Sequence, residues 1–171
     1  MDPRVDVSAT ALAQEFEMEK KVIDLVAVSY EFHQQAARLR AALADAQKKL
    51  EQKADAGVTV TALKEFDQKA IKLQGSDAGG GGPRGGAKPK PTFALLNREL
   101  AALATTVDGQ DAAPTPAMQT AYTDYCRDLA TTVQSWNELI QTDLAGLNDQ
   151  LRKQSMTPLA SSALVVPAAC R

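Results

Sequence analysis

Residues that could do chemistry are few and widely separated in this chain. The single histidine, His33, has no second histidine for a zinc-protease motif, and Tyr30 stands where a di-iron bundle needs a glutamate. We expect His33 at the surface of a helix or at the boundary of the core. Cys126 and Cys170 lack the spacing of a metal site, and His33 is the only histidine available to activate either thiol. We therefore predict no catalytic residue, no cofactor and no metal site, and we do not expect an enzyme.

The glycine-rich stretch at residues 80–85 matches the G-x-G-x-x-G pattern of dinucleotide-binding proteins. Such a site needs a strand before the glycines and a helix after them, so that backbone N–H groups point at the pyrophosphate. Here the motif lies within residues 75–91, a segment that holds seven of the ten glycines of the chain. The composition predicts a disordered linker instead.

The two cysteines leave one question open. Cys126 falls within the last long helical pattern, and Cys170 lies in the C-terminal tail. A disulfide between them requires the tail to fold back along that helix, because the two Cα atoms of a disulfide lie within about 7 Å of each other. The sequence is compatible with both the paired and the free form.

The composition favours helices and excludes several classes of partner. Aromatic residues make up 5 % of the chain and alanine is abundant, which argues against a β-sandwich or a barrel. Charged residues make up 23 % with a net charge of −2, so no nucleic-acid surface is expected. No apolar run reaches the ~18 residues needed to span a bilayer.

These signals predict an all-α protein, an antiparallel bundle of two long and two short helices with a disordered Gly/Pro-rich linker. Residues 1–7 form an extended N-terminal segment, 8–74 hold helices one and two, 75–91 form the linker, 92–155 hold helices three and four, and 156–171 form a flexible tail. The first helix should end near Lys53 with Gly57 as its cap, and the second should end shortly before Gly75. Thr92 should begin the third helix, and the last should run unbroken from Pro116, with Thr115 as its N-cap, to about Gln154. The two long helices are expected to be antiparallel to each other.

The helical faces identify one core residue and one surface. Trp136 lies in the middle of the apolar stripe of the last helix, so we predict that it anchors the core. The first helix is apolar on two opposite sides, and one side is expected to be an interface, because the short second helix cannot cover both. In the alternative, the other helices of the chain cover this side. The interface residues are Leu12, Phe16, Ile23, Val26 and Tyr30.

Two segments together resemble a known region. The first is Asp2-Pro3-Arg4-Val5 with the helix that follows, and the second runs from Phe93 to Leu159 and includes Asp111-Ala112-Ala113-Pro114-Thr115, Trp136, Asp143-Leu144, Leu147-Asn148 and Leu151-Arg152. This pattern resembles the C-terminal helical region of large bacterial secreted proteins with sialidase-like β-propellers of the BNR-repeat and sortilin type. The resemblance implies a helical hairpin that follows a small β domain. The chain has no propeller, no BNR Asp-box and no arginine cluster of a sialidase, so no catalytic residue is carried over.

We therefore expect a non-catalytic helical accessory or interaction module, a fragment or solitary relative of such a C-terminal region, whose partner is a β-propeller or β-domain parent. The alternative is an independent small helical adaptor or chaperone-like binding protein that self-associates. The first twenty residues lack the apolar core of a signal peptide. A complete chain would then be cytoplasmic, and a fragment of an exported protein would be periplasmic or secreted.

Overall fold

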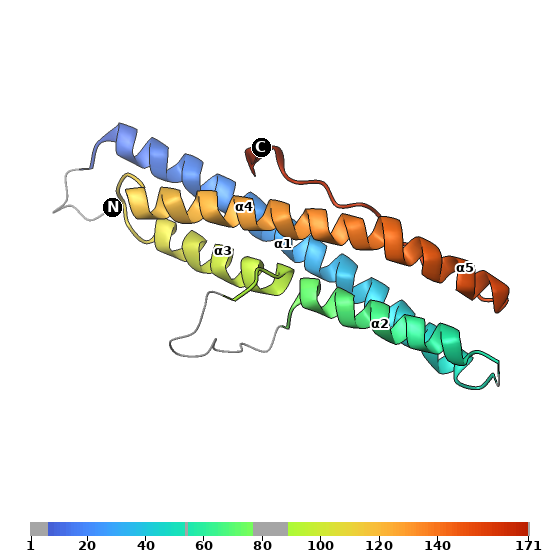
Figure 1. Ribbon diagram of the computed structural model, residues 1–171. Coiled ribbons are helices and arrows are strands. Elements are labelled where there is room, and N and C mark those ends of the chain that lie inside the picture. Colours follow the sequence, from blue (N-terminus) through green and yellow to red (C-terminus); the bar gives the residue numbers. More distant parts are fainter. Residues whose placement is uncertain (1–6, 54, 77–88, 171) are drawn as a thin grey trace.

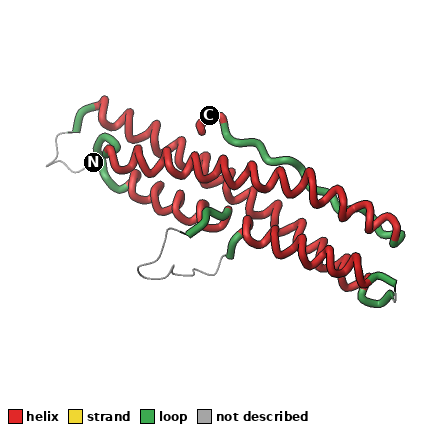
Figure 2. Tube along the Cα trace, viewed as in Figure 1, coloured by secondary structure: helices red, strands yellow, loops and turns green. Residues whose placement is uncertain are grey.

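The computed structural model describes residues 7–53, 55–76 and 89–170. Within these ranges the protein is all-α, as predicted, and the tube in Figure 2 contains helices and loops without a strand. The elements in order are α1 (Ala9–Leu50), α2 (Gly57–Gln74), α3 (Phe93–Asp108), α4 (Pro116–Leu139), the π-helical turn η1 (Ile140–Leu144), α5 (Ala145–Lys153) and the 3-10 turn η2 (Ala168–Cys170). Most of the expected N-terminal segment 1–7 and of the linker 75–91 lies outside the described residues.

Helix α1 extends over 42 residues because no glycine or proline interrupts it. It begins after Ser8, whose Oγ accepts a hydrogen bond from the backbone N–H of Ala11 at 3.1 Å. It ends at Leu50, earlier than the predicted Lys53. The prediction that Gly57 caps α1 is wrong, because Gly57 is the first residue of α2.

Helices α2 and α3 follow each other along one line of the bundle (Figure 1). Gly75 ends α2 with a φ of 80°, and Thr92 begins α3 by accepting a hydrogen bond from the N–H of Leu95. A φ in this region favours glycine because a Cβ would clash with the backbone. Both caps agree with the sequence signals. The two short helices together act as one interrupted rod.

Helix α4 begins as predicted, with Thr115 as its N-cap and Pro116 at its first turn. It does not continue unbroken to Gln154, because the π-helical turn η1 separates α4 from α5. A π turn is one residue longer than an α turn. Leu139 and Leu144, five residues apart, therefore both face the core.

The two long rods, α1 and α4–α5, run in the same direction, so the expectation that they are antiparallel is wrong (Figure 1). Gln14 of α1 and Gln119 of α4 line one cleft near the beginning of both rods. At the other end, Lys53 Nζ donates to the carbonyl of Gln154 at 2.7 Å. The interrupted rod α2–α3 runs antiparallel to both, so each rod is antiparallel to the rod that precedes or follows it in the chain.

The core lies where the three rods meet. Phe32 of α1 packs edge-on against Phe93 of α3, with ring centroids 5.7 Å apart, and Phe93 packs edge-on against Trp136 of α4 at 6.0 Å. Trp136 has no exposed surface. Edge-to-face aromatic contacts of this kind add to the hydrophobic gain of burial. This aromatic cluster therefore ties α1, α3 and α4 together near the middle of the bundle.

Polar contacts fix α2 in the bundle. The guanidinium of Arg40 on α1 contacts both carboxylate oxygens of Asp67, at 2.6 and 3.1 Å, and donates to Gln74 Oε1 at 2.8 Å. On its other side, α2 forms an ion pair between Lys69 and Asp143 of η1. This contact raises the pKa of Lys69, first through the hydrogen bond and then through the charge of Asp143. These two ion pairs determine which side of α2 lies toward α1 and which side lies toward η1.

Candidate functional site

The N-terminal half of α1 exposes an apolar face. Phe16, Ile23 and Tyr30 are 62 %, 49 % and 55 % exposed, which is high for side chains of this size. They follow each other at intervals of seven residues, so they lie on one side of the helix. We call Leu12, Phe16, Ile23, Val26 and Tyr30 the α1 face. Leu12 and Val26 are half-buried at its edge.

The opposite side of the same helical segment forms the core. Met18, Val22 and Leu25 are buried there, and the two last have no exposed surface. The other of the two apolar sides predicted for this helix is buried farther along α1, from Phe32 to Leu50. Helix α1 is thus covered along one side from Glu15 to Leu50, while the α1 face stays open near its beginning.

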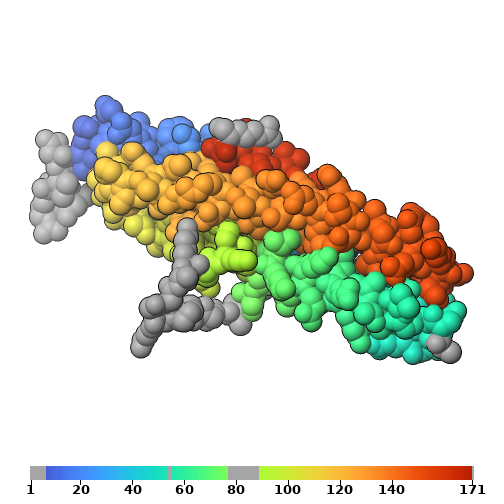
Figure 3. Space-filling model, in the orientation of Figure 1, coloured from blue at the N-terminus to red at the C-terminus, as the bar shows by residue number. Residues whose placement is uncertain are grey.

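A second surface feature lies in the seam between α1 and α4–α5. The chain turns back after α5, and residues 156–170, here called the strap, run along α4 toward its beginning (Figure 1). In the space-filling view of Figure 3, the red atoms of the strap lie between blue α1 and orange α4. The prediction of a flexible tail is therefore wrong. Residues Ala160 to Ser162 lie near Arg38, Leu39 and Ala42 of α1.

Two asparagine side chains hold the strap by its backbone. Asn148 donates to the carbonyl of Leu159 at 2.9 Å and accepts from the N–H of the same residue at 2.7 Å. Asn137 does the same at Leu164, at 2.9 and 2.8 Å. Each asparagine therefore satisfies both backbone groups of one strap residue, as a neighbouring β-strand would.

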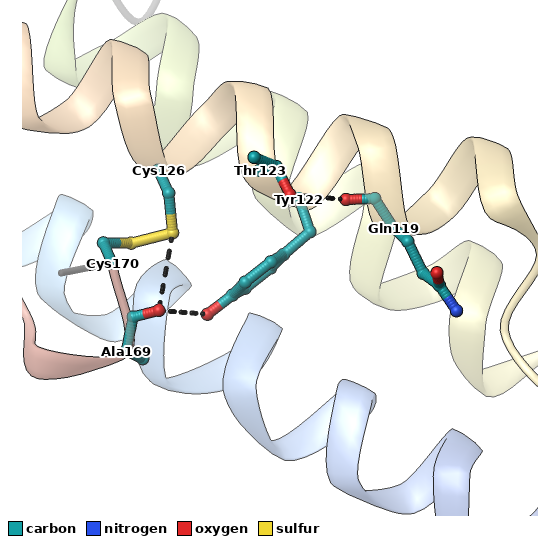
Figure 4. Close-up of a disulfide and its surroundings, with 6 residues drawn as sticks. All are labelled: Gln119, Tyr122, Thr123, Cys126, Ala169 and Cys170. Atoms are coloured by element: carbon teal, nitrogen blue, oxygen red, sulfur yellow. Dashed lines mark hydrogen bonds between the residues drawn. A yellow bond between two sulfur atoms is a disulfide. The ribbon is translucent and has the colours of Figure 1, made fainter.

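A disulfide between Cys126 and Cys170 holds the end of the strap, so the structure decides the pairing that the sequence left open (Figure 4). The phenol of Tyr122 donates to the carbonyl of Ala169 at 3.2 Å beside it. Burial, and to a smaller extent the charge of Asp24, raises the pKa of Tyr122. The hydroxyl therefore stays protonated and able to donate over a wider pH range.

These strap contacts were not predicted, although the sequence carries one signal for them. Cys126, Asn137 and Asn148 follow each other at intervals of eleven residues, which is close to three helical turns and places them on one side of the helix. Beyond the strap, the seam is open as a cleft of about 540 Å³. Its lining includes Gln14, Met18 and Lys21 of α1 and Pro114 and Gln119 near the start of α4.

Two sequence features remain, His33 and the glycine motif at residues 80–85. His33 is buried, rather than at the surface or boundary as expected, and the glycine motif at 80–85 lies outside the described residues. Within residues 7–53, 55–76 and 89–170, no three His, Cys, Asp or Glu side chains come together in a way that could hold a metal ion. None of the helices described is both long and apolar enough to cross a bilayer.

Comparison with known proteins identifies no relative of this chain. No protein-family model matches the chain, and neither a curated protein nor a solved structure is significantly similar to it.

Proposed function

We propose that this chain is a non-catalytic helical interaction module that docks through the α1 face onto a β domain of a larger secreted protein. The observation that carries the proposal is the exposure of Phe16, Ile23 and Tyr30 on one side of a helix whose other side is buried core. Large apolar side chains that cluster on a surface mark sites of protein interaction.

Two further features support this partner and its location. The sequence resembles the helical region that follows a small β domain in secreted β-propeller proteins, beginning with Asp2-Pro3-Arg4-Val5. The disulfide between Cys126 and Cys170 fits an oxidising compartment, because structural disulfides are rare where thiols are kept reduced. An exported parent protein would meet both conditions.

The test is co-expression with the β domain encoded next to this chain in its own gene locus. Wild type should bind that domain, and the double variant Phe16→Glu/Ile23→Glu should lose binding while its far-UV circular dichroism stays helical. Val58→Glu is the matched control, because Val58 is 79 % exposed on α2, away from the α1 face. A locus without a β domain, or equal binding by all three proteins, contradicts the proposal.

Self-association through the same face is a second candidate function. The seven-residue intervals between Phe16, Ile23 and Tyr30 are those of a two-stranded coiled coil, which a second α1 face could complete. Sedimentation equilibrium separates the cases. A wild type that associates and a folded, monomeric Phe16→Glu/Ile23→Glu variant support self-association. A wild type that is strictly monomeric excludes self-association. If the variant also unfolds, the α1 face is ordinary core, and neither docking onto a β domain nor self-association is correct.

A further inference from the structure

The seam under the strap recognises an extended backbone. Asn137 and Asn148 make four hydrogen bonds to the strap, and all four go to the N–H and C=O groups of Leu164 and Leu159. A side-chain amide that pairs with both groups of one residue requires that residue to be extended, but makes no demand on its side chain. The contacts would therefore form equally well with a segment from another chain.

The spacing of these anchors fits an extended segment. Asn137 and Asn148 are eleven helical residues apart, which corresponds to about 16 Å along the helix. Leu159 and Leu164 are five residues apart, which corresponds to about 16 Å in an extended chain. A segment that is extended overall and antiparallel to α4–α5 can therefore engage both asparagines at once.

Side chains of the strap add a sequence preference. Leu164 is buried to 5 % exposure, and Leu159 and Val166 pack partly against the core. Between the two leucines the strap has only small residues, from Ala160 to Ala163. The seam beside them stays partly hollow, with a cavity of about 420 Å³ between α1 and the strap. The seam thus selects two leucines five residues apart, with a cysteine six residues after the second.

The connection between the strap and α5 is a single turn at Ser155, closed by hydrogen bonds from the N–H of Ser155 to the carbonyl of Arg152 and from the N–H of Met156 to the carbonyl of Leu151, both at 2.9 Å. Ser155 has a φ of 56°, in the left-handed region that residues with a Cβ rarely adopt. It is exposed, and it is the point at which the chain turns back along α5. Extending this turn would release the left-handed backbone of Ser155 at the cost of these two hydrogen bonds, and it would carry the strap away from its own seam. A short connection of this kind is a place at which terminal elements can exchange between copies of a protein.

From these observations we propose that the seam between α1 and α4–α5 is a docking site for an extended polypeptide of the strap's kind, and that a second copy of this chain can supply its strap in trans. The strap seated in its own seam shows the contacts that the strap of a second copy would repeat, because the second copy has the same sequence, and exchange requires that Cys126 and Cys170 have not yet paired within one chain. This docking surface differs from the α1 face, so the inference goes beyond the proposed function.

The experiment traps the exchange in full-length chains. A donor copy carries Cys126→Ser, and its remaining Cys170 is converted to a mixed disulfide with thiopyridine. An acceptor copy carries Cys170→Ser and keeps Cys126 as a free thiol. When the donor strap enters the acceptor seam, the Cys126 thiolate attacks the sulfur of Cys170, a new disulfide forms and thiopyridone leaves. The absorbance of thiopyridone gives the rate, and only mixed dimers can form.

In the acceptor, that copy's own strap competes with the donor's strap for the seam. The first comparison removes this competition. Leu159→Asp/Leu164→Asp in the acceptor removes both apolar anchors from that copy's strap without touching its seam. The trapping rate should then rise about tenfold or more, because a tethered competitor acts at an effective concentration in the millimolar range. Circular dichroism and the melting temperature show whether this acceptor is folded. An unchanged rate with a folded acceptor overturns the proposal.

The second comparison separates docking from random collision. In the disabled acceptor, Asn137→Ala/Asn148→Ala should slow trapping by about tenfold or more, because four hydrogen bonds to the incoming strap are lost. The same two substitutions in the donor should not slow it, since they only release the donor's strap. This asymmetry does not depend on global stability. The proposal is wrong if the asparagine substitutions change the trapping rate equally in donor and acceptor, or do not change it at all. Either result means that the two thiols meet by random collision.

Discussion

Gly75 and Thr92 face each other closely, although residues 76–91 separate them in the sequence. A methyl group on Gly75 would lie 2.8 Å from Cβ of Thr92 and 3.2 Å from Cβ of Ala94, and it would overlap the Thr92 hydroxyl. One residue is the C-cap of α2 and the other is the N-cap of α3. The end of one short helix therefore abuts the start of the next, and glycine is required for both space and backbone angle.

We expect Gly75→Ala to destabilise the protein by roughly 1–3 kcal/mol, because its φ of 80° and ψ of −177° are accessible almost only to glycine. Gly146→Ala is the matched control. Gly146 lies within α5 and has open space around it, so alanine there should stabilise the helix by up to about 1 kcal/mol. Urea denaturation measures both, and a neutral Gly75→Ala would show that the two caps are not tightly apposed.

Replacing Trp136 tests the aromatic cluster. Trp136→Ala should cost roughly 3–5 kcal/mol, because the side chain is fully buried against Phe93. Trp136→Phe should cost clearly less, since it keeps an aromatic ring there and the indole Nε1 makes no hydrogen bond with the described residues. The measurement is the midpoint of chemical denaturation. A midpoint that Trp136→Ala leaves unchanged would contradict the core role.

Each asparagine should protect its own strap residue. Asn137→Ala leaves the N–H and C=O of Leu164 without their partner, which should weaken strap docking by roughly 1–3 kcal/mol. Hydrogen exchange at the Leu164 amide should speed up accordingly. Asn148→Ala should act in the same way on Leu159. If both variants accelerated both amides equally, the strap would open as one unit, and the two contacts would not be independent.

Removing the disulfide should lower global stability. Cys126 and Cys170 are 44 residues apart, and a crosslink over a loop of this size stabilises a protein by roughly 2–4 kcal/mol. The double variant Cys126→Ser/Cys170→Ser should melt earlier than oxidised wild type. A reducing agent should lower the melting temperature of wild type and leave that of the variant unchanged. A reductant effect on the variant would point to a cause other than the disulfide.

Tyr122 should make strap docking sensitive to alkaline pH. Burial raises its pKa above the usual 10.0, so it contributes stability that is present below that pH. The contribution is lost as the pH rises through the folded-state pKa, because the phenolate can no longer donate to Ala169. Phenolate absorbance of wild type minus that of Tyr122→Phe gives the titration. The variant should lack the corresponding alkaline loss of stability, and a titration at or below pH 10 would contradict the burial of this hydroxyl.

Local signals determined the helices and most of their ends. Thr92 and Thr115 cap helices as the sequence predicts, and the apolar stripe of α3, from Phe93 to Val107, is buried as its spacing indicates. Such features depend on residues within one or two turns of each other, so they can be predicted from the sequence. The side of α1 that carries Phe16 and Ile23 was recognisable for the same reason.

Contacts between distant segments decided the rest. The relative direction of the long helices followed from α2 and α3 sharing one rod, which depends on Gly75 meeting Thr92 and not on either helix alone. Likewise, the path of the strap depends on Asn137, Asn148 and Cys126 reaching residues 11 to 44 positions away. The sequence by itself determined four helices and an apolar face. Only the tertiary structure determined that the last residues close a seam of the bundle. The free energy of docking the strap arises from contacts between distant residues, which no local sequence pattern encodes.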